Sequence, residues 1–340
     1  MLGFGPHECP YRVAAAGRRW QLRTYAAPGS GPVLLVVSSP IKRPYIWDLA
    51  PTRSAVRYCL RRGLRVHLLE WTPASRRDGN CGLAEYVDEG LGEAVAVLSR
   101  QSGETRPFLI GHSLGGTFAA IFSALERDRI RGLVLLATPL CFAPGTSGFR
   151  DSLVKISPSG LSHVTVVPGS LLSQISAVAA PMTFVWSRLA DGAISSATDP
   201  DAASVCARVE RWALDEVPLP GQLVDQILRW LYREDRFCAG TLRVGDRTVG
   251  SSGIRVPTLM VVNLHDEIAP PRSVTPVADA RPGPEIRLIE HSGECGVGLQ
   301  HLAILVGRQA HAYVWPQIVN WIEQAAGTRA DDAPATSAGG

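Results

Sequence analysis

Lysine is almost absent from this chain of 340 residues: Lys42 and Lys155 are the only two among 34 basic residues. Basic and acidic residues, 34 and 31 in number, are scattered along the chain and leave a formal net charge of only +3. A protein that binds nucleic acid instead concentrates its basic residues on one segment or face. The charge pattern therefore predicts no nucleic-acid partner.

Long hydrophobic runs are missing as well. The longest apolar stretch, Leu171 to Trp186, is interrupted by Gln174 and Pro181, and it is shorter than the ~20 residues that span a bilayer. Residues 1–17 lack the basic start and apolar core of a secretory signal peptide. We therefore expect neither a membrane span nor export.

The cysteines follow no recognisable scheme. They are odd in number, widely spaced and without a Cys-x-x-Cys pair, which is typical of reduced structural thiols in a reducing compartment. No spacing of potential ligands suggests a metal site. We therefore expect a cytoplasmic protein without a metal or other cofactor, in which all seven cysteines are reduced. They are Cys9, Cys59, Cys81, Cys141, Cys206, Cys238 and Cys295.

The most informative stretch that is present is Gly111-His112-Ser113-Leu114-Gly115, which lies between an apolar strand (108–110) and a helical stretch (117–127). A serine on so tight a turn adopts a strained backbone, and the flanking glycines remove Cβ atoms that would clash. The first N–H groups of the helix point back at the hydroxyl and favour developing negative charge. The pentapeptide alone also fits a glycine-rich turn with a chance serine, but the strand and helix around it favour a nucleophile.

Strands and helices alternate over most of the chain. Short runs rich in branched apolar residues predict buried strands, and longer amphipathic stretches predict helices. Strands that alternate with helices of ten or more residues are typical of a mostly parallel, doubly wound α/β sheet. The expected strands are 32–38, 64–71, 108–110, 130–138, 256–263 and 285–289, and the expected helices are 52–62, 83–101, 117–127 and 310–324.

The alternation stops between residues 140 and 253, where the periodicity is mainly helical. The clearest helix, 223–231, has one apolar face, which we interpret as ordinary core packing. The whole block predicts a helical cap inserted into the sheet domain and covering its site. The expected units are an N-terminal segment (1–30), an α/β-hydrolase core (31–140 and 254–326), the helical cap (141–253) and a disordered tail (327–340).

A nucleophilic serine needs a base, and histidine is the side chain best suited to this task. In α/β-hydrolase folds the order along the chain is serine, acid, histidine, with the acid after a late strand and the histidine after the last one. Asp266 and His301 occupy these positions relative to Ser113. Glu267 is the alternative acid, and His291 is the alternative base because it also follows the last strand.

An oxyanion hole requires two N–H donors. Leu114, directly after the serine, should provide one of them. The other should come from the loop after the first strand, where Pro40 has no N–H and Ile41 is the best candidate. His112 is expected to pack beside the turn rather than to take part in the chemistry.

Several further stretches extend the pattern well beyond the serine turn. Together with that turn they resemble the polyhydroxyalkanoate synthases, especially the shorter two-subunit kind, from about residue 30 to 325. Those enzymes polymerise hydroxyacyl groups from coenzyme A thioesters through a nucleophile assisted by an Asp and a His. The resemblance implies the same roles for Ser113, Asp266 and His301, and it implies a possible second subunit. The stretches are 41–49, 54–58, 69–73, 86–88, 208–215, 265–271 and 301–321.

The chain departs from that family at four points. Ser113 replaces the family's cysteine, which favours oxyester chemistry or hydrolysis over thioester exchange. Glu267 replaces a His, and Lys42 replaces an Asn in the loop expected to form the oxyanion hole. The stretch before His301 is longer than in the family, so His291 stays an alternative base.

Three functions fit these features. The first is a serine acyl-enzyme that takes an acyl group from a coenzyme A or acyl-carrier-protein thioester and passes it to an alcohol or amine. The second is a thioesterase or carboxylesterase, in which water is the acceptor. The third is a noncatalytic partner or granule-associated protein that keeps the fold.

Overall fold

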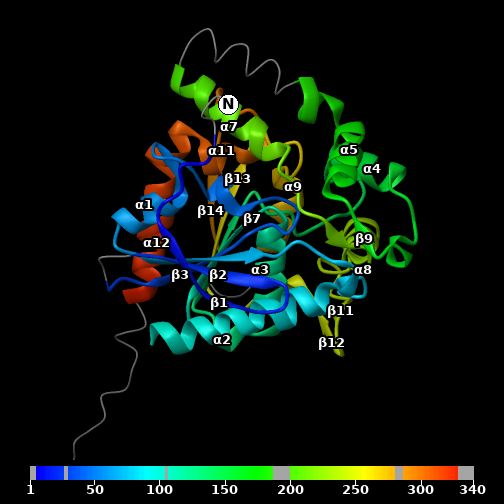
Figure 1. The fold of residues 1–340 in the computed structure, drawn as a ribbon, viewed down its shortest axis with the longest axis horizontal. Coiled ribbons are helices and arrows are strands. Elements are labelled where there is room, and N and C mark those ends of the chain that lie inside the picture. Colours follow the sequence, from blue (N-terminus) through cyan, green and yellow to red (C-terminus); the bar gives the residue numbers. More distant parts are fainter. Residues whose placement is uncertain (1–4, 27–29, 104–105, 187–199, 280–285, 328–340) are drawn as a thin grey trace, which may run out of the picture.

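One eight-stranded sheet organises the molecule (Figure 1), in a computed structural model that describes residues 5–26, 30–103, 106–186, 200–279 and 286–327. The strand order is β1-β2-β6-β3-β7-β8-β13-β14. Neighbouring strands from β6 to β14 are parallel, whereas β1 and β2 are added in antiparallel fashion. The sheet confirms the predicted fold class. Its strands are β1 (Tyr11–Ala16), β2 (Trp20–Tyr25), β3 (Val33–Val37), β6 (Arg65–Trp71), β7 (Phe108–His112), β8 (Gly132–Leu136), β13 (Thr258–Asn263) and β14 (Ile286–His291).

The central strands β3, β7, β8 and β13 are buried along their whole length. Helices cover both faces of the sheet (Figure 1), and this explains why these strands appear in the sequence as continuous apolar runs rather than as an alternation. One hydrophobic cluster contains residues of α2 and α3, and the other contains residues of α1 and α12. The helices are α1 (Ala55–Arg61), α2 (Leu91–Ser102), α3 (Leu114–Leu125), α9 (Pro271–Val274), α10 (Pro276–Asp279), α11 (Ala303–Val306) and α12 (Trp315–Gly327).

All four predicted helices differ from the observed ones at their first turns. The helix expected from residue 117 begins at Leu114, and the one expected from residue 310 starts as a π-helical segment, η10 (Ala310–Val314), before α12. The helix expected from residue 52 begins at Ala55, because residues 53 and 54 pair in the short strand β5 (Arg53–Ser54) with β4 (Asp48–Ala50). The Ser54 side chain then caps α1 by accepting a hydrogen bond from the N–H of Arg57 at 2.8 Å. The helix expected over 83–101 starts as a π-helical segment, η3 (Ala84–Gly90), before it continues as α2.

The N-terminal residues require a correction. The sequence-based division left residues 1–30 outside the core, but β1 and β2 form one edge of the main sheet, where β2 pairs with β6. Trp20, Leu22 and Tyr25 on β2 are buried, and this burial holds the hairpin on the sheet. The sequence did not predict these two strands, because β1 is an edge strand with largely exposed side chains and therefore lacks an apolar run.

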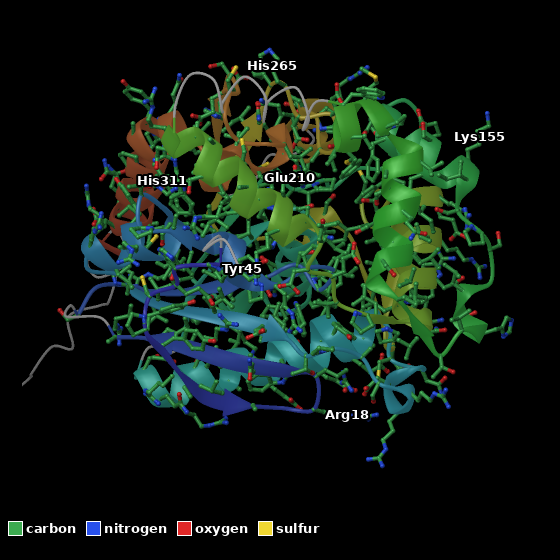
Figure 2. The ribbon with its side chains drawn as sticks, turned by 45° about the horizontal axis from the view of Figure 1, so that its top comes forward. Arg18, Tyr45, Lys155, Glu210, His265 and His311 are labelled. Atoms are coloured by element: carbon green, nitrogen blue, oxygen red, sulfur yellow. A yellow bond between two sulfur atoms is a disulfide. The ribbon has the colours of Figure 1, made fainter. Side chains whose placement is uncertain are left out.

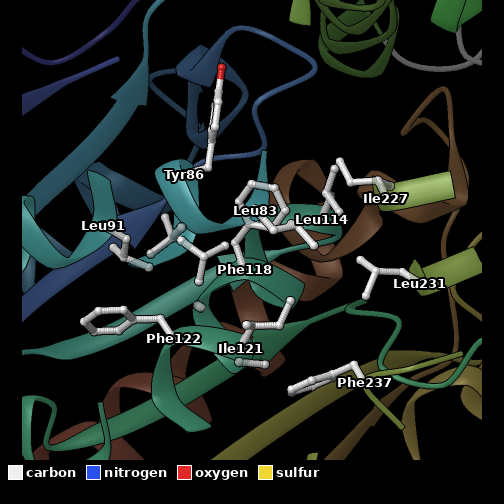
Figure 3. Packing of buried hydrophobic residues seen from close by; sticks show 14 of the residues in the cluster. Leu83, Tyr86, Leu91, Leu114, Phe118, Ile121, Phe122, Ile227, Leu231 and Phe237 are labelled. Carbon is white, nitrogen blue, oxygen red and sulfur yellow. The ribbon is translucent and has the colours of Figure 1, made fainter. Parts of the chain in front are cut away.

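The residues between β8 and β13, predicted as a helical cap, carry helices and also two small two-stranded sheets that were not predicted. Figure 1 shows α4, α5 and α8 gathered on one side of the main sheet. Figure 3 shows that this segment shares a core with the sheet domain, since Leu231 and Phe237 pack in one cluster with Phe118 of α3. Its elements are α4 (Gly148–Ile156), β9 (Val166–Val167), α5 (Gly169–Ala179), η6 (Met182–Trp186), α7 (Pro200–Ala213), β10 (Leu219–Pro220), α8 (Gly221–Gln226), η7 (Ile227–Arg233), β11 (Leu242–Val244) and β12 (Arg247–Val249).

A disulfide joins Cys141, just after β8, to Cys238, which follows η7. The prediction of seven reduced cysteines was therefore wrong for this pair, and the cysteine pattern no longer argues for the cytoplasmic location, which stays a prediction. The pairing could not be seen in the sequence because 97 positions separate the two residues. Cys9, Cys59, Cys81 and Cys206 are free and buried, and Cys295 is free and exposed.

Two further predictions concern the C-terminal tail and membrane-spanning segments. The predicted disordered tail, 327–340, lies outside the described residues apart from Gly327, the last residue of α12. In the described ranges, no helix combines the length and the apolar character needed to cross a bilayer.

Candidate active site

Ser113 sits on the predicted tight turn between β7 and α3, with a φ of 54° and a ψ of −131°. A positive φ is strained for a residue with a side chain, and nucleophile elbows of this kind concentrate such strain. A Cβ on Gly111 would lie 2.5 Å from the Cα of Gly116, and a Cβ on Gly115 would lie 2.4 Å from the carbonyl oxygen of Val37. The two glycines are therefore required by close backbone approach, as the sequence predicted.

The structure brings Asp266 and His301 into direct contact. His301 Nδ1 lies 2.7 Å from Asp266 Oδ2. The other carboxylate oxygen, Oδ1, accepts hydrogen bonds from the N–H groups of Ile268 and Ala269 at 2.8 and 3.0 Å. Burial acts to raise the pKa of Asp266, but His301 and these hydrogen bonds outweigh it and hold the pKa below its ordinary value. The carboxylate therefore stays charged and holds the Nδ1–H of the imidazole.

The opposite nitrogen of the same ring, His301 Nε2, is buried and has no hydrogen-bond partner among the described residues. His301 and Ser113 both line one cavity of about 570 Å³. Because Nδ1 carries the proton that is shared with Asp266, Nε2 has a free lone pair. This is the arrangement in which an imidazole can take a proton from a hydroxyl.

The alternative acid and base lie elsewhere. His291 Nε2 is 3.4 Å from Glu294 Oε1, and the His291 side chain does not line the cavity. Glu267 accepts a hydrogen bond from the hydroxyl of Thr183. Neither alternative residue contacts Asp266 or His301 through its side chain in the described structure, so the geometry favours the first pair.

The two predicted oxyanion donors also border the cavity. Leu114 is the first residue of α3, directly after the serine. Ile41 lines the cavity, and its carbonyl oxygen accepts a hydrogen bond from the N–H of Val217 at 3.1 Å. The roles of both N–H groups remain predictions.

Lys42 has a position that the sequence did not predict. It is largely buried, and its ammonium group donates to Ser173 Oγ at 2.9 Å and to the carbonyl oxygen of Ala213. It also lies 3.4 Å from Glu216 Oε1. By contrast, Lys155 is exposed and projects from the surface (Figure 2). Lys42 therefore links the loop after β3 to the segment between β8 and β13.

Most residues that line the cavity belong to the segment between β8 and β13. The apolar face of helix 223–231 packs in the core as predicted, and Val224, Ile227 and Leu228 also line the cavity. Both environments are apolar, so hydrophobic periodicity could not separate them. Further lining residues missed in the sequence are Phe149, Leu153, Leu172, Ile175, Phe184, Trp212 and Tyr232.

Metal ligands are not gathered at this site. Within the described ranges, no group of three or more His, Cys, Asp or Glu side chains is placed to hold a metal ion.

Comparison with known proteins supports the fold. A family model described as the alpha/beta hydrolase fold matches residues 53–296. Among solved structures, a monoacylglycerol lipase from Paleococcus ferrophilus superposes with a TM-score of 0.56 at 18% identity, covering 90% of this chain and 99% of that one. The structure of the DcsB complex with its substrate analogue gives 0.57 at 17% identity, covering 94% and 100%. At such identities these structures show the fold alone.

Sequence relatives are more specific. The poly(3-hydroxyalkanoate) polymerase subunit PhaC of Haloferax mediterranei is 28% identical over 308 residues, which are 88% of this chain and 60% of that protein. The subunit of the same name from Allochromatium vinosum is 26% identical over 305 residues, covering 89% and 84%. This chain therefore spans 60% of the length of the Haloferax relative and 84% of the Allochromatium one.

Proposed function

Because the chain belongs to the α/β-hydrolase fold family, we propose that it is an acyl-transferring enzyme that works through an acyl-serine on Ser113. The donor is a thioester of coenzyme A or of an acyl carrier protein, and the acceptor is an alcohol or an amine. One observation carries the proposal. The Asp266-bound His301 has a free Nε2 and lines the same cavity as the strained Ser113.

In the first half-reaction, Ser113 Oγ bonds to the acyl carbon while its proton moves to His301 Nε2. The negative charge that develops on the carbonyl oxygen is stabilised by the N–H groups of Leu114 and Ile41, together with the amino end of α3. Asp266 stabilises the imidazolium. The bond from carbon to sulfur then breaks, and the thiol leaves with the proton from His301.

In the second half-reaction, the acceptor gives its proton to His301 Nε2 as its oxygen or nitrogen bonds to the acyl carbon. The ester bond to Ser113 breaks, and the serine regains the proton. No step requires a resident metal or cofactor. The substrate supplies the acyl group, and the histidine carries one proton in each direction.

Two features favour transfer over hydrolysis. The lining of the cavity is mainly apolar and is contributed largely by the segment between β8 and β13, and an apolar lining limits the access of water to an acyl-enzyme. The relatives are named poly(3-hydroxyalkanoate) polymerase subunits, and a polymerase that joins hydroxyalkanoates joins acyl groups to hydroxyl groups. A second subunit or a carrier protein would be consistent with those names.

Hydrolysis is the second candidate, because the residue at the elbow is serine rather than the cysteine of the resembled family. The two functions share all catalytic residues and differ only in whether water reaches the acyl-enzyme. A noncatalytic protein is disfavoured, since that hypothesis predicts no convergence of the three side chains, whereas Asp266 and His301 are hydrogen-bonded and Ser113 lines the same cavity as His301.

The test is product analysis with a panel of acyl-CoA donors, with and without an alcohol acceptor. We expect ester to exceed free acid when the alcohol is present. Ser113→Ala should lower turnover by roughly a millionfold, whereas Ser152→Ala on α4, outside the cavity, should not change it. Free acid as the main product at saturating alcohol would establish the hydrolase, and full turnover by Ser113→Ala would refute both enzymes.

A further inference from the structure

The segment that carries the proposed base is short. His301 lies in η9 (Gln300–Leu302), a single helical turn of three residues. The preceding loop contains Gly293, Gly296 and Gly298, all with positive φ, and Gln300 links the turn to this loop by donating to the carbonyl oxygen of Glu294 at 2.7 Å. The position of the imidazole also depends on contacts that other elements make with the turn.

Two side chains at the carboxyl ends of β13 and β7, the strands on either side of β8, supply these contacts. Asn263, the last residue of β13, donates to the carbonyl oxygen of Gln300 at 2.7 Å. His112, the last residue of β7, places its Nε2 2.7 Å from the carbonyl oxygen of His301 itself. The two strands thus hold consecutive carbonyl groups of the turn.

The contact of His112 defines its tautomer. A carbonyl oxygen can only accept a hydrogen bond, so Nε2 of His112 must carry the proton. The His112 ring also packs against the ring of His301, with centroids 4.6 Å apart and an interplanar angle of 50°. His112 is buried at 6% exposure, so its ring has little freedom to reorient.

The charge state of His112 matters because of this proximity. Burial, followed by the neighbouring His301, lowers the pKa of His112 to about 3. A positive charge on His112 would oppose the imidazolium that His301 becomes during each half-reaction. A neutral ring donates the same hydrogen bond without that repulsion.

We propose that His112 is a positioning residue for the base: its neutral Nε2–H and its ring hold the turn of His301, so that the imidazole keeps its place beside Asp266 in the wall of the cavity that Ser113 also lines. The role rests on the proposed function of His301, and it goes beyond the expectation that His112 only packs beside the elbow. A displacement of about 1 Å in a catalytic group costs on the order of a hundredfold in rate.

The test compares His112→Phe, which keeps an aromatic ring without the donor, with His112→Gln, which keeps an N–H donor. We expect His112→Phe to lower kcat by about 10- to 100-fold with KM changed less than twofold, and we expect His112→Gln to recover most of kcat. Melting temperatures are measured in parallel, since a purely structural role would lower them in both variants without separating their kcat values. His112→Leu replaces the Phe variant if that protein does not fold.

A second readout does not depend on turnover. The His301 Nδ1–H, donated to Asp266, should give a downfield proton NMR signal that is absent in His301→Ala. This signal should stay sharp in His112→Gln and broaden in His112→Phe. Equal signals and equal kcat in all His112 variants would overturn the proposed role. If the wild type shows the signal and its loss in His112→Phe but forms no acyl product, the proposed function fails while the positioning role stands.

Discussion

Asp266→Asn is the substitution whose effect follows most directly from the geometry. In the wild type, Oδ1 accepts two backbone N–H groups, from Ile268 and Ala269, and Oδ2 faces His301 Nδ1. An asparagine would keep its carbonyl oxygen toward the two N–H donors, because an amide NH₂ there would meet them donor to donor. Its NH₂ group would then face His301.

The consequence is a change of tautomer. An NH₂ group can only donate, so Nδ1 of His301 must become the acceptor and the ring proton must move to Nε2. Nε2 then has no lone pair for the proton of Ser113. In a serine protease the equivalent change lowers kcat by about 10⁴, which corresponds to about 5 kcal/mol of lost transition-state stabilisation.

The assay is kcat at neutral pH with the best acyl donor from the panel, normalised to folded protein. Asp128→Asn is the matched control, because its side chain is 92% exposed and far less constrained, and kcat should not change. A loss of less than tenfold for Asp266→Asn would show that Asp266 does not set the protonation of the base, and the reasoning would be refuted.

Three further predictions concern stability and the cavity. Cys238→Ala opens a covalent loop of 97 residues and should lower the free energy of unfolding by about 4–5 kcal/mol in chemical denaturation. Cys295 is free and exposed, so Cys295→Ala should change the free energy of unfolding by no more than about 0.5 kcal/mol. Equal stability of the two variants would contradict the disulfide. Burial lowers the pKa of His67 from 6.5 to about 4, so between these pH values the unfolded chain binds more protons than the folded one. The free energy of unfolding should therefore fall as pH decreases from 6.5 to 4, and His67→Gln should reduce the slope of this free energy against pH by up to about 1.4 kcal/mol per pH unit. An unchanged slope would exclude this role of His67. Leu228→Trp should fill part of the cavity and lower kcat/KM for donors with the longest acyl chains by about tenfold relative to donors with the shortest chains. An unchanged preference for chain length would show that the acyl chain does not bind beside Leu228.

The parts of the fold that could be predicted are those in which burial or backbone geometry restricts the local sequence. The central strands are buried on both faces, so each appears as an uninterrupted apolar run. The elbow was predictable because strain at Ser113 and close approach at Gly111 and Gly115 permit few other sequences. The Asp266 and His301 pair followed from chain order alone, and the structure brings them together at 2.7 Å.

The features that were missed depend on contacts between distant segments. The hairpin of β1 and β2 has an exposed edge strand, so its pattern carries little signal. The bond between Cys141 and Cys238 depends on how the segment after β8 folds back. The contact of His112 with the His301 carbonyl joins positions 189 residues apart, and no pattern in either segment indicates it.

The central claim is that Ser113 becomes acylated, and intact-mass spectrometry tests it most directly. After brief incubation with each acyl thioester of the panel and rapid acid quenching, the wild type should gain the mass of one acyl group, with the adduct located on the peptide that contains Ser113. Ser113→Ala should gain nothing. An adduct of the same occupancy in Ser113→Ala, or no adduct in the wild type with any donor that it consumes, would contradict the account.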